Sequence, residues 1–475
     1  MSRFWLPFLL VFAGRILAAA AVEGGAMDVQ KAINTALTQN RDLARLALQL
    51  ESALLTEGGA EDEFKPNLQP LGQVGRSQDA ASYTYGLRAL QRFTWGTDVE
   101  LSGQASEAGL SDSAFSARDS IKASVSQPLF RYAGPLVNGE RIRKARSGVA
   151  AAQRTVEMKK TDLVVEVVAL YENILRLQRQ LESDILATKR LDKLFRLSRA
   201  KELQGRSTRV DSLRVELQVG QAQARLQNTT EQLLSIRQDF ADLLGFTPDT
   251  AFEISVAPTL DLAVPEKDGE AIRIALENRL DFAQSLQDYR DAARGMKIAG
   301  RNLLPNIKVV GRYEKYGQGQ NTSEAWPLDN DEWFVGLVAD TDLMKRSEKT
   351  AYRQSIISKQ TAFDNIDSAR NMISRQVSQQ RLAYARACSE VVIAGRNLTL
   401  ADNRLKLARK LYELGRGDSF AVSDAEDEYS KAQQEFLRTQ AEVSIAGYRM
   451  LRSMGTLLPY PNELKPQPLS EHEKE

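Results

Sequence analysis

The side chains that most often catalyse reactions or bind metals are scarce in this chain of 475 residues. It contains one histidine, His472, and one cysteine, Cys388. A structural zinc site needs about four nitrogen, sulfur or carboxylate ligands, and a Ser/His/Asp triad would depend on a histidine in a charged tail. No glycine-rich phosphate loop is present. These residue types argue against an enzyme and against a resident metal or cofactor.

Charged side chains are abundant but balanced, with 63 Lys and Arg against 62 Asp and Glu. This balance argues against binding to nucleic acid. Residues 1–21 are predicted to be a secretory signal peptide, because Arg3 precedes an apolar run and alanines at 18–21 offer cleavage sites between 20 and 26. No later window of about 18 residues is apolar enough for a transmembrane helix. Cys388 has no partner for an intrachain disulfide and is expected to pack within a helix.

The sequence contains an internal repeat, so the helices and strands that would position functional residues are expected to occur twice. Ala32–Leu37 resembles Ala271–Leu276, which lies 239 residues later, and the match continues to Asn67 and Asn306. Further along, Gly205-Arg206 matches Gly415-Arg416 at a spacing of 210. We therefore expect a first repeat over 27–245, an inter-repeat segment over 246–267, a second repeat over 268–455 and a charged tail over 456–475.

Each repeat is predicted to contain three helices. An opening helix covers 28–62 or 268–302 and stops before Pro66 or Pro305. A very long helix follows over 138–204 or 347–414 and ends at Gly205 or Gly415. A shorter helix returns over 208–245 or 419–454. The first long helix carries a heptad seam, which requires a partner helix, at Leu163, Val167, Leu170, Ile174, Leu177 and Leu181.

Alternating apolar and polar residues predict strands between the opening and long helices of each repeat. They include Ile121 to Val125, Ile307 to Tyr313 and Trp333 to Ala339. The first repeat holds 29 more residues than the second between its two matching regions, since the spacing falls from 239 to 210. We expect an extra β-hairpin near 83–106, with a turn at Trp95-Gly96, that lengthens, widens or covers one end of a barrel.

The element lengths predict a rod with all strands at one end and the glycine turns at the other. The helix over 138–204 would span roughly 100 Å at 1.5 Å per residue. Two shorter helices stacked end to end would match it, with 246–267 as an excursion at mid-height. Because lipid permits strands only in a closed barrel, and about six strands hardly close a wide one, several chains must share it. The fold class is thus mixed but mainly α.

Several short motifs, in this order and duplicated, resemble the TolC family of outer-membrane efflux proteins over nearly all of the mature chain. Asn40–Leu43 and Arg279–Phe282 resemble the opening of each family repeat. The other matching motifs lie at the two helix–strand junctions and at the second turn: Leu303–Asn306, Ser126–Phe130 and Tyr412–Ala425.

The resemblance implies a homotrimer with a shared transmembrane β-barrel in outer-membrane lipid and a long α-helical barrel in the periplasm. Its partners would be a periplasmic adaptor and an inner-membrane transporter of a tripartite efflux pump or type I secretion system. The duct would be passive, bind no cofactor and bind no nucleic acid. Asp342–Met344 departs from the family's Pro-Leu-Phe pattern after the last strand.

The resemblance also implies where a periplasmic gate and the adaptor contacts lie. The family often places acids six and nine residues after the turn glycine; here these positions are Ala421 and Asp424 in the second repeat, and Asp211 and Arg214 in the first. Asp424 would form a threefold acidic ring or remain an exposed acid near a helix start. Asp211 would pair across the tip or act as a first-turn acid. Residues of the two tip turns are candidates for adaptor contact: Gly205, Arg206, Gly415, Arg416, Gly417 and Asp418.

Two further interpretations of side chains stay open at this point. Glu426 and Asp427 are expected on a solvated helix face. Six aromatic residues are either interfacial aromatics of a barrel or pack on neighbouring strands: Tyr83, Tyr85, Phe93, Trp95, Trp333 and Phe334. The alternative function is a periplasmic or surface coiled-coil scaffold without a pore, which does not explain the strands after Pro66 and Pro305.

Overall fold

The computed structural model describes residues 26–76, 80–110, 113–250, 252–254, 265 and 267–470. The predicted signal peptide lies outside these residues. The chain divides into two compact units. Of the described residues, the first unit comprises those within 26–44, 159–271 and 376–458, and the second comprises those within 45–158, 272–375 and 459–470. Each unit draws on both sequence repeats.

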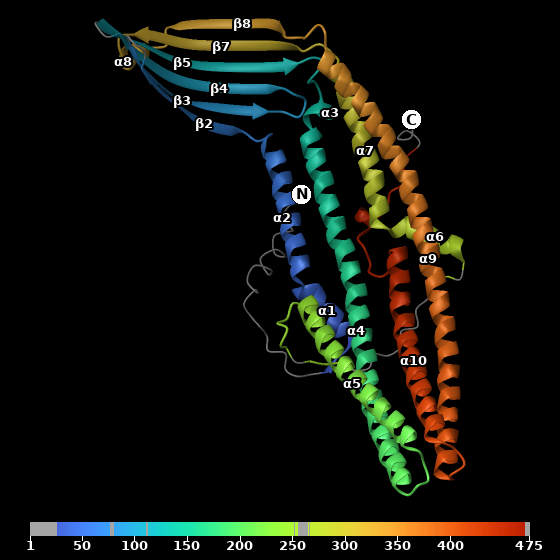
Figure 1. Ribbon diagram of the computed structural model, residues 1–475. Coiled ribbons are helices and arrows are strands. Elements are labelled where there is room, and N and C mark those ends of the chain that lie inside the picture. Colours follow the sequence, from blue (N-terminus) through green and yellow to red (C-terminus); the bar gives the residue numbers. More distant parts are fainter. Residues whose placement is uncertain are drawn as a thin grey trace. The chain divides into compact units, whose positions relative to one another are not determined.

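The helices and strands follow the predicted order in both repeats (Figure 1). The first repeat contains α1 (Val29–Gln39), α2 (Arg41–Asp62), β2 (Asn67–Arg76), β3 (Ala80–Arg92), β4 (Asp98–Leu110), β5 (Ser113–Pro128), α3 (Pro135–Asn138), α4 (Glu140–Leu203) and α5 (Arg209–Leu244). The second contains α6 (Asp268–Asn278), α7 (Leu280–Arg301), β7 (Ile307–Gly319), α8 (Thr322–Ala325), β8 (Asn330–Ala339), α9 (Arg346–Glu413) and α10 (Ser419–Met454).

The opening helix of each repeat is broken, which corrects the prediction of single helices over 28–62 and 268–302. The breaks fall at Asn40 and Arg279, again 239 residues apart, where the backbone is extended. Asn40 stabilises its break by accepting from the backbone N–H of Leu43 and by donating to the carbonyl of Leu243 at 2.9 Å. Arg279 instead contacts the Asp281 carboxylate at 2.6 Å.

The core of the first unit confirms the predicted heptad seam. Leu163, Val167 and Ile174 of α4 are fully buried, and Leu170 and Leu181 pack partly buried against the same cluster. Their partners come from α1 and α5, including Ile33 and Phe240. A helix with apolar residues at heptad spacing buries that stripe on its neighbours, and here the neighbours belong to the same chain.

The second unit contains an antiparallel sheet in the order β2-β3-β4-β5-β7-β8 (Figure 1). The predicted extra hairpin is confirmed as β3 and β4, joined by a turn over 93–97 that includes Trp95 and Gly96. It lies inside the sheet, between β2 and β5, rather than over one of its faces. The six aromatic residues predicted as interfacial or strand-packed are all exposed to a substantial degree in the single chain.

The helix α8 lies on the sheet over β4, β5 and β7. Gly317 and Gly319 of β7 make room for it, because a Cβ at Gly317 would come within 1.9 Å of the Ala325 carbonyl oxygen. Asp119 of β5, paired in register with Gly317, is almost completely buried. The loop between β7 and β8 thus packs against the sheet through α8, at the place where the two glycines of β7 leave room.

Two shorter segments follow the helical hairpins. In the inter-repeat segment, β6 (Glu253–Ile254) pairs in parallel with β1 (Ala26–Met27), and most of 255–266 lies outside the described residues. The C-terminal tail contains a short 3-10 turn over Asn462–Leu464. The Arg154 guanidinium donates to the carbonyl of Leu464, and that of Arg290 to the carbonyl of Gln467. The tail up to residue 470 is therefore bonded to the second unit.

None of the helices in the described residues has the length and the apolar character needed to cross a membrane.

Candidate functional site: the helical tips

The two predicted tip turns have the same backbone structure. Gly205 and Gly415 adopt φ angles of +70° and +72°, in the left-handed region that favours glycine. The N–H of the following arginine, Arg206 or Arg416, bonds in each case to a carbonyl five residues earlier at 2.9 Å. This is a Schellman motif, which satisfies the last carbonyls of α4 and α9. The repeat seen in the sequence is thus a structural repeat at the tips.

The helices that return from the tips begin with side-chain caps. In α5, Thr208 and Asp211 form a reciprocal capping box, with the Thr208 hydroxyl 2.7 Å from the Asp211 carboxylate. In α10, Asp418 accepts from the N–H of Ala421 at 2.8 Å. Hydrogen bonds from Thr208 hold the pKa of Asp211 below its ordinary value. Within this chain, Asp211 is in the first turn of α5 and caps its start.

The gate candidate Asp424 is ion-paired within its own chain. Arg404 of α9 contacts the Asp424 carboxylate of α10 at 2.7 Å and also contacts Glu428 one turn further along. All three side chains are about half exposed. Arg214, the other gate candidate of the first repeat, lies over the Phe420 ring with its guanidinium carbon 4.9 Å from the centroid.

The tip arginines are exposed. Arg206 and Arg416 project from the turns, and within the described part of the chain neither guanidinium forms an ion pair. The remaining turn residues predicted for adaptor contact are also accessible: Gly205, Gly415 and Asp418 are exposed, and Gly417 is half-buried. A Cβ added to Gly417 would lie 3.2 Å from the backbone nitrogen of Tyr412, so the second turn is tightly closed.

The prediction that Glu426 lies on a solvated helix face is wrong. Its side chain is only 4% exposed and lies between two guanidinium groups. Arg190 of α4 donates to its carboxylate at 2.6 Å, and Arg409 of α9 contacts the other oxygen. Asp427, its neighbour, is half-buried and pairs with Arg225 and Lys431. Glu426 thus connects α10 to both long helices.

Four polar pairs between α4 and α10 follow a heptad-like spacing on α4. They join Glu172 to Ser444, Arg179 to Gln440, Ser183 to Gln433 and Arg190 to Glu426. The pairs run antiparallel, since positions rise along α4 as they fall along α10. We call these eight residues the polar seam. Burial raises the pKa of Glu172, although its hydrogen bond from Ser444 opposes this shift.

A small apolar cluster lies between the polar seam and the tip turns. Tyr412 is buried in it, and the Lys201 ammonium contacts the Tyr412 ring 3.5 Å from its centroid and donates to the Tyr412 carbonyl. Burial raises the pKa of the Tyr412 hydroxyl. The buried members come from four helices: Leu191, Leu194, Val215, Ala222, Tyr412 and Val422. Sequence spacing could not have identified this cluster, because its members come from both repeats, with Leu191 and Tyr412 lying 221 positions apart.

At the tips, ion pairs connect neighbouring helices, and exposed arginines and apolar side chains form the surface. These apolar side chains lie on the outer faces of the four helices: Leu203, Val210, Leu213, Leu217, Leu414 and Phe420.

Comparison with known proteins agrees with this description. Residues 271–456 match the family model described as Outer membrane efflux protein. No curated protein matches the chain. Among solved structures, the outer-membrane channel OprN aligns with a TM-score of 0.71 at 16% identity, over 90% of this chain and 89% of OprN. VceC of Vibrio cholerae aligns with a TM-score of 0.70 at 14% identity, over 90% and 96%. The CmeC channel of Campylobacter jejuni gives 0.70 at 12% identity, over 90% and 86%.

Proposed function

We propose that this chain, a TolC-like outer-membrane efflux protein by its family match and its fold, is the exit duct of a tripartite efflux pump or a type I secretion system. It is located in the outer membrane, with its helices extending into the periplasm. Substrates would be driven through it by an inner-membrane transporter, so the duct itself performs no chemistry.

The observation that carries this proposal is the sheet. Its outermost strands, β2 and β8, have no further strand partner within the described residues, and they expose large apolar side chains such as Val74 and Trp333. A soluble protein protects such edges because they pair with other chains. A homotrimer would satisfy them by pairing β8 of one copy with β2 of the next, which closes the barrel in lipid.

At the helical tips, we propose that the ion pairs hold the duct closed. Three copies would bring three Asp424–Arg404 pairs around one axis, and breaking those pairs would leave an acidic ring in a narrow passage. The Glu426 carboxylate would keep α10 against α4 and α9 in the closed state. Asp211 and Arg214 would support the tip through the capping box and the Phe420 contact.

The exposed tip turns would dock a periplasmic adaptor. Arg206 and Arg416 offer bidentate donors to carboxylates or backbone carbonyls of such a partner. The apolar side chains beside them, Leu203 and Leu414, would provide buried area in the complex. The inner-membrane partner would select the exported substrate.

A membrane fractionation followed by bilayer recording tests the proposal. An exit duct stays in the membrane after a high-salt wash and gives discrete conductance steps when the purified protein is added to a planar bilayer. A coiled-coil scaffold without a pore would wash off and give no steps, which would overturn the proposal. The Asp424→Asn variant then tests the gate, because a pore constricted by Asp424 should lose cation selectivity.

A further inference from the structure

We infer that the inserted strands β3 and β4 are pore-wall strands, so that each copy contributes six strands to the barrel and three copies form one of eighteen. This inference rests on the proposed function for the barrel itself. It goes further by assigning the insertion a place in the wall and by predicting a wider outer-membrane end.

The hydrogen-bond register of the inserted strands is continuous with the sheet on both sides. β3 pairs with β2 over ten residues and with β4 over thirteen, and β4 pairs with β5 along nearly its whole length. Each inserted strand has 13 residues, whereas a tilted strand needs about 9–11 residues to cross a membrane. Both strands are therefore long enough to span.

The two faces of the inserted strands match those of their neighbours. On one face, the register places Leu87 beside Gly103 and Ile121, and Ala89 beside Leu101 and Ala123. This apolar face continues onto β7 and β8 through Tyr313, which pairs with both Ala123 and Trp333. A strand pair that merely covered the barrel would not share its apolar face with the wall strands β5, β7 and β8.

The opposite face is polar across the same strands. Arg88 of β3 pairs with Glu100 of β4 at 2.8 Å. Further along the sheet, Arg118 of β5 pairs with Glu314 of β7 at 3.1 Å. Wall strands of a water-filled barrel alternate between apolar residues toward lipid and polar residues toward the lumen. The inserted strands follow this alternation, and their charges on the lumen side are paired.

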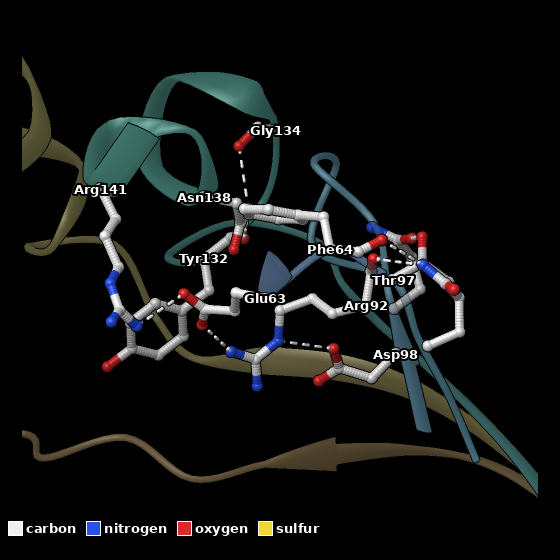
Figure 2. A network of polar contacts seen from close by, with 11 residues as sticks. Glu63, Phe64, Arg92, Thr97, Asp98, Tyr132, Gly134, Asn138 and Arg141 are labelled. Atoms are coloured by element: carbon white, nitrogen blue, oxygen red, sulfur yellow. Dashed lines mark hydrogen bonds and ion pairs between the residues drawn. The ribbon is translucent and has the colours of Figure 1, made fainter. Parts of the chain in front are cut away.

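The turn of the inserted hairpin is bonded to the helix–strand junction (Figure 2). Arg92, at the end of β3, contacts Glu63 just after α2 at 2.7 Å and Asp98 at the start of β4 at 3.0 Å. Glu63 also contacts Arg141 of α4 at 2.9 Å. The hairpin is thus connected through one carboxylate to two helices, as a wall strand must be where the barrel meets the helices.

The tip of the turn is fitted closely to the same junction. The N–H of Gly134 donates to the carbonyl of Trp95 at 2.8 Å. Gly96 has a φ of +96°, and a Cβ there would lie 2.6 Å from the carbonyl oxygen of Tyr132. Asn138 of α3 closes the junction by donating to that same carbonyl (Figure 2). These contacts require glycine and fix the hairpin in the plane of the sheet.

The consequence is a barrel end that is wider than four strands per copy would give. Barrel diameter grows roughly linearly with strand number, so six strands in place of four enlarge it by about half. Barrels of 16–18 strands enclose an aqueous channel. The outer end of this duct would therefore be an open, polar exit chamber.

Single cysteines on the two faces test the assignment. In a Cys388→Ser background, Gln104→Cys lies on the polar face and Leu101→Cys on the apolar face of β4. In protein reconstituted into vesicles, a water-soluble thiol reagent should label position 104 severalfold faster than 101. A lipid-soluble quencher of an attached probe should show the reverse order. Equal labelling, or labelling of 101 alone, would overturn the inference.

Deleting residues 80–110 provides a second test, because it joins the far end of β2 directly to β5. Electron-microscopy images of the assembled particle should show a barrel end reduced to about two thirds of its diameter. An unchanged diameter would overturn the inference. If the deletion does not assemble, the labelling of Gln104→Cys and Leu101→Cys decides. If the unaltered protein forms no conducting trimer, the proposed function fails; if it forms one but the labelling or the diameter contradicts the expectations above, only the inference about β3 and β4 fails.

Discussion

The carboxylate of Glu426 on α10 accepts a hydrogen bond of 2.6 Å from Arg190 on α4, a residue 236 positions earlier in the chain. Because Arg409 of α9 contacts the other oxygen, one buried anion connects three helices close to the tips. Removing one partner of a buried ionic group costs far more than removing an exposed one, since the remaining charges lose both their partner and their water.

Replacing this anion should therefore destabilise the helical tips. We expect Glu426→Gln to reduce the free energy of unfolding by about 3 kcal/mol, because two guanidinium groups would face a neutral amide. The matched control is Asp427→Asn, whose half-buried pairs should be worth at most about 1 kcal/mol. Thermal unfolding followed by far-ultraviolet circular dichroism measures both. Equal shifts for the two variants would contradict the role assigned to Glu426.

Replacing Gly205 or Gly415 by alanine should lower the stability of the tips, although there is space for the added side chain. Nothing lies within 4 Å of a Cβ at Gly205 or Gly415, so the cost of alanine comes from the left-handed backbone alone. We expect Gly205→Ala and Gly415→Ala each to cost about 1–2 kcal/mol. Gly220 is also unobstructed but lies inside α5, so Gly220→Ala should stabilise by about 0.5–1 kcal/mol. Protease cleavage at the tips should rise in the first two variants only.

Neutralising Arg404 should make the pore more selective for cations. Arg404 masks the carboxylates of both Asp424 and Glu428, and its loss leaves two unpaired negative charges per copy. Reversal potentials in a salt gradient should shift toward cations in Arg404→Gln and away from them in Asp424→Asn. Lys406→Gln serves as the control, because within the described residues Lys406 pairs with Asp402 of its own helix and with no residue of α10. A shift of the same size in that variant would place the selectivity elsewhere.

Because Glu172 of the polar seam is partly buried, the free energy of unfolding should fall as pH rises. Burial raises the pKa of Glu172 in the folded chain, so the folded state holds this proton more tightly than the unfolded state. Stability is then lost as pH increases from the ordinary glutamate pKa through the raised one, and stays lower above it.

We expect Glu172→Gln to be more stable than the unaltered chain at neutral pH, because glutamine still accepts the hydrogen bond from Ser444 without carrying a charge. The advantage should vanish at pH values below the ordinary glutamate pKa. Unfolding midpoints measured across this range test it, with Glu166→Gln, an exposed position on the same helix, as the control. Similar pH profiles for both variants would contradict the assignment.

Much of the fold followed from the sequence because glycine and proline mark its boundaries. The long and return helices end within two residues of their predicted limits, since Gly205 and Gly415 provide the only conformation that closes the turns. The extra hairpin was predictable from the 29 additional residues and the alternation around Trp95-Gly96. Its place inside the sheet was not, because strand order depends on pairing between distant segments.

The parts that sequence reasoning missed depend on tertiary contacts. Arg279 is an ordinary helix residue by propensity, whereas Asn40 is a common N-cap residue whose break is also bonded to the distant Leu243 carbonyl. Glu426 looks like a solvated acid in the second turn of a helix until Arg190 and Arg409 are brought beside it. The capping role of Asp211 could have been found, because threonine three residues before an acid at a helix start is a capping-box pattern.

The polar seam lies between two apolar clusters, one that includes Tyr448 of α10 and one that includes Val422. Three of the four seam pairs can exchange their partners for water at modest net cost, whereas the buried Glu426–Arg190 pair and the apolar contacts cannot. If α10 moves away from α4, those three pairs can be hydrated one after another, each releasing its partner in turn. The tip can therefore separate along the seam only after the Val422 cluster and the Glu426 pair have opened, while the cluster around Tyr448 keeps α10 packed on the core.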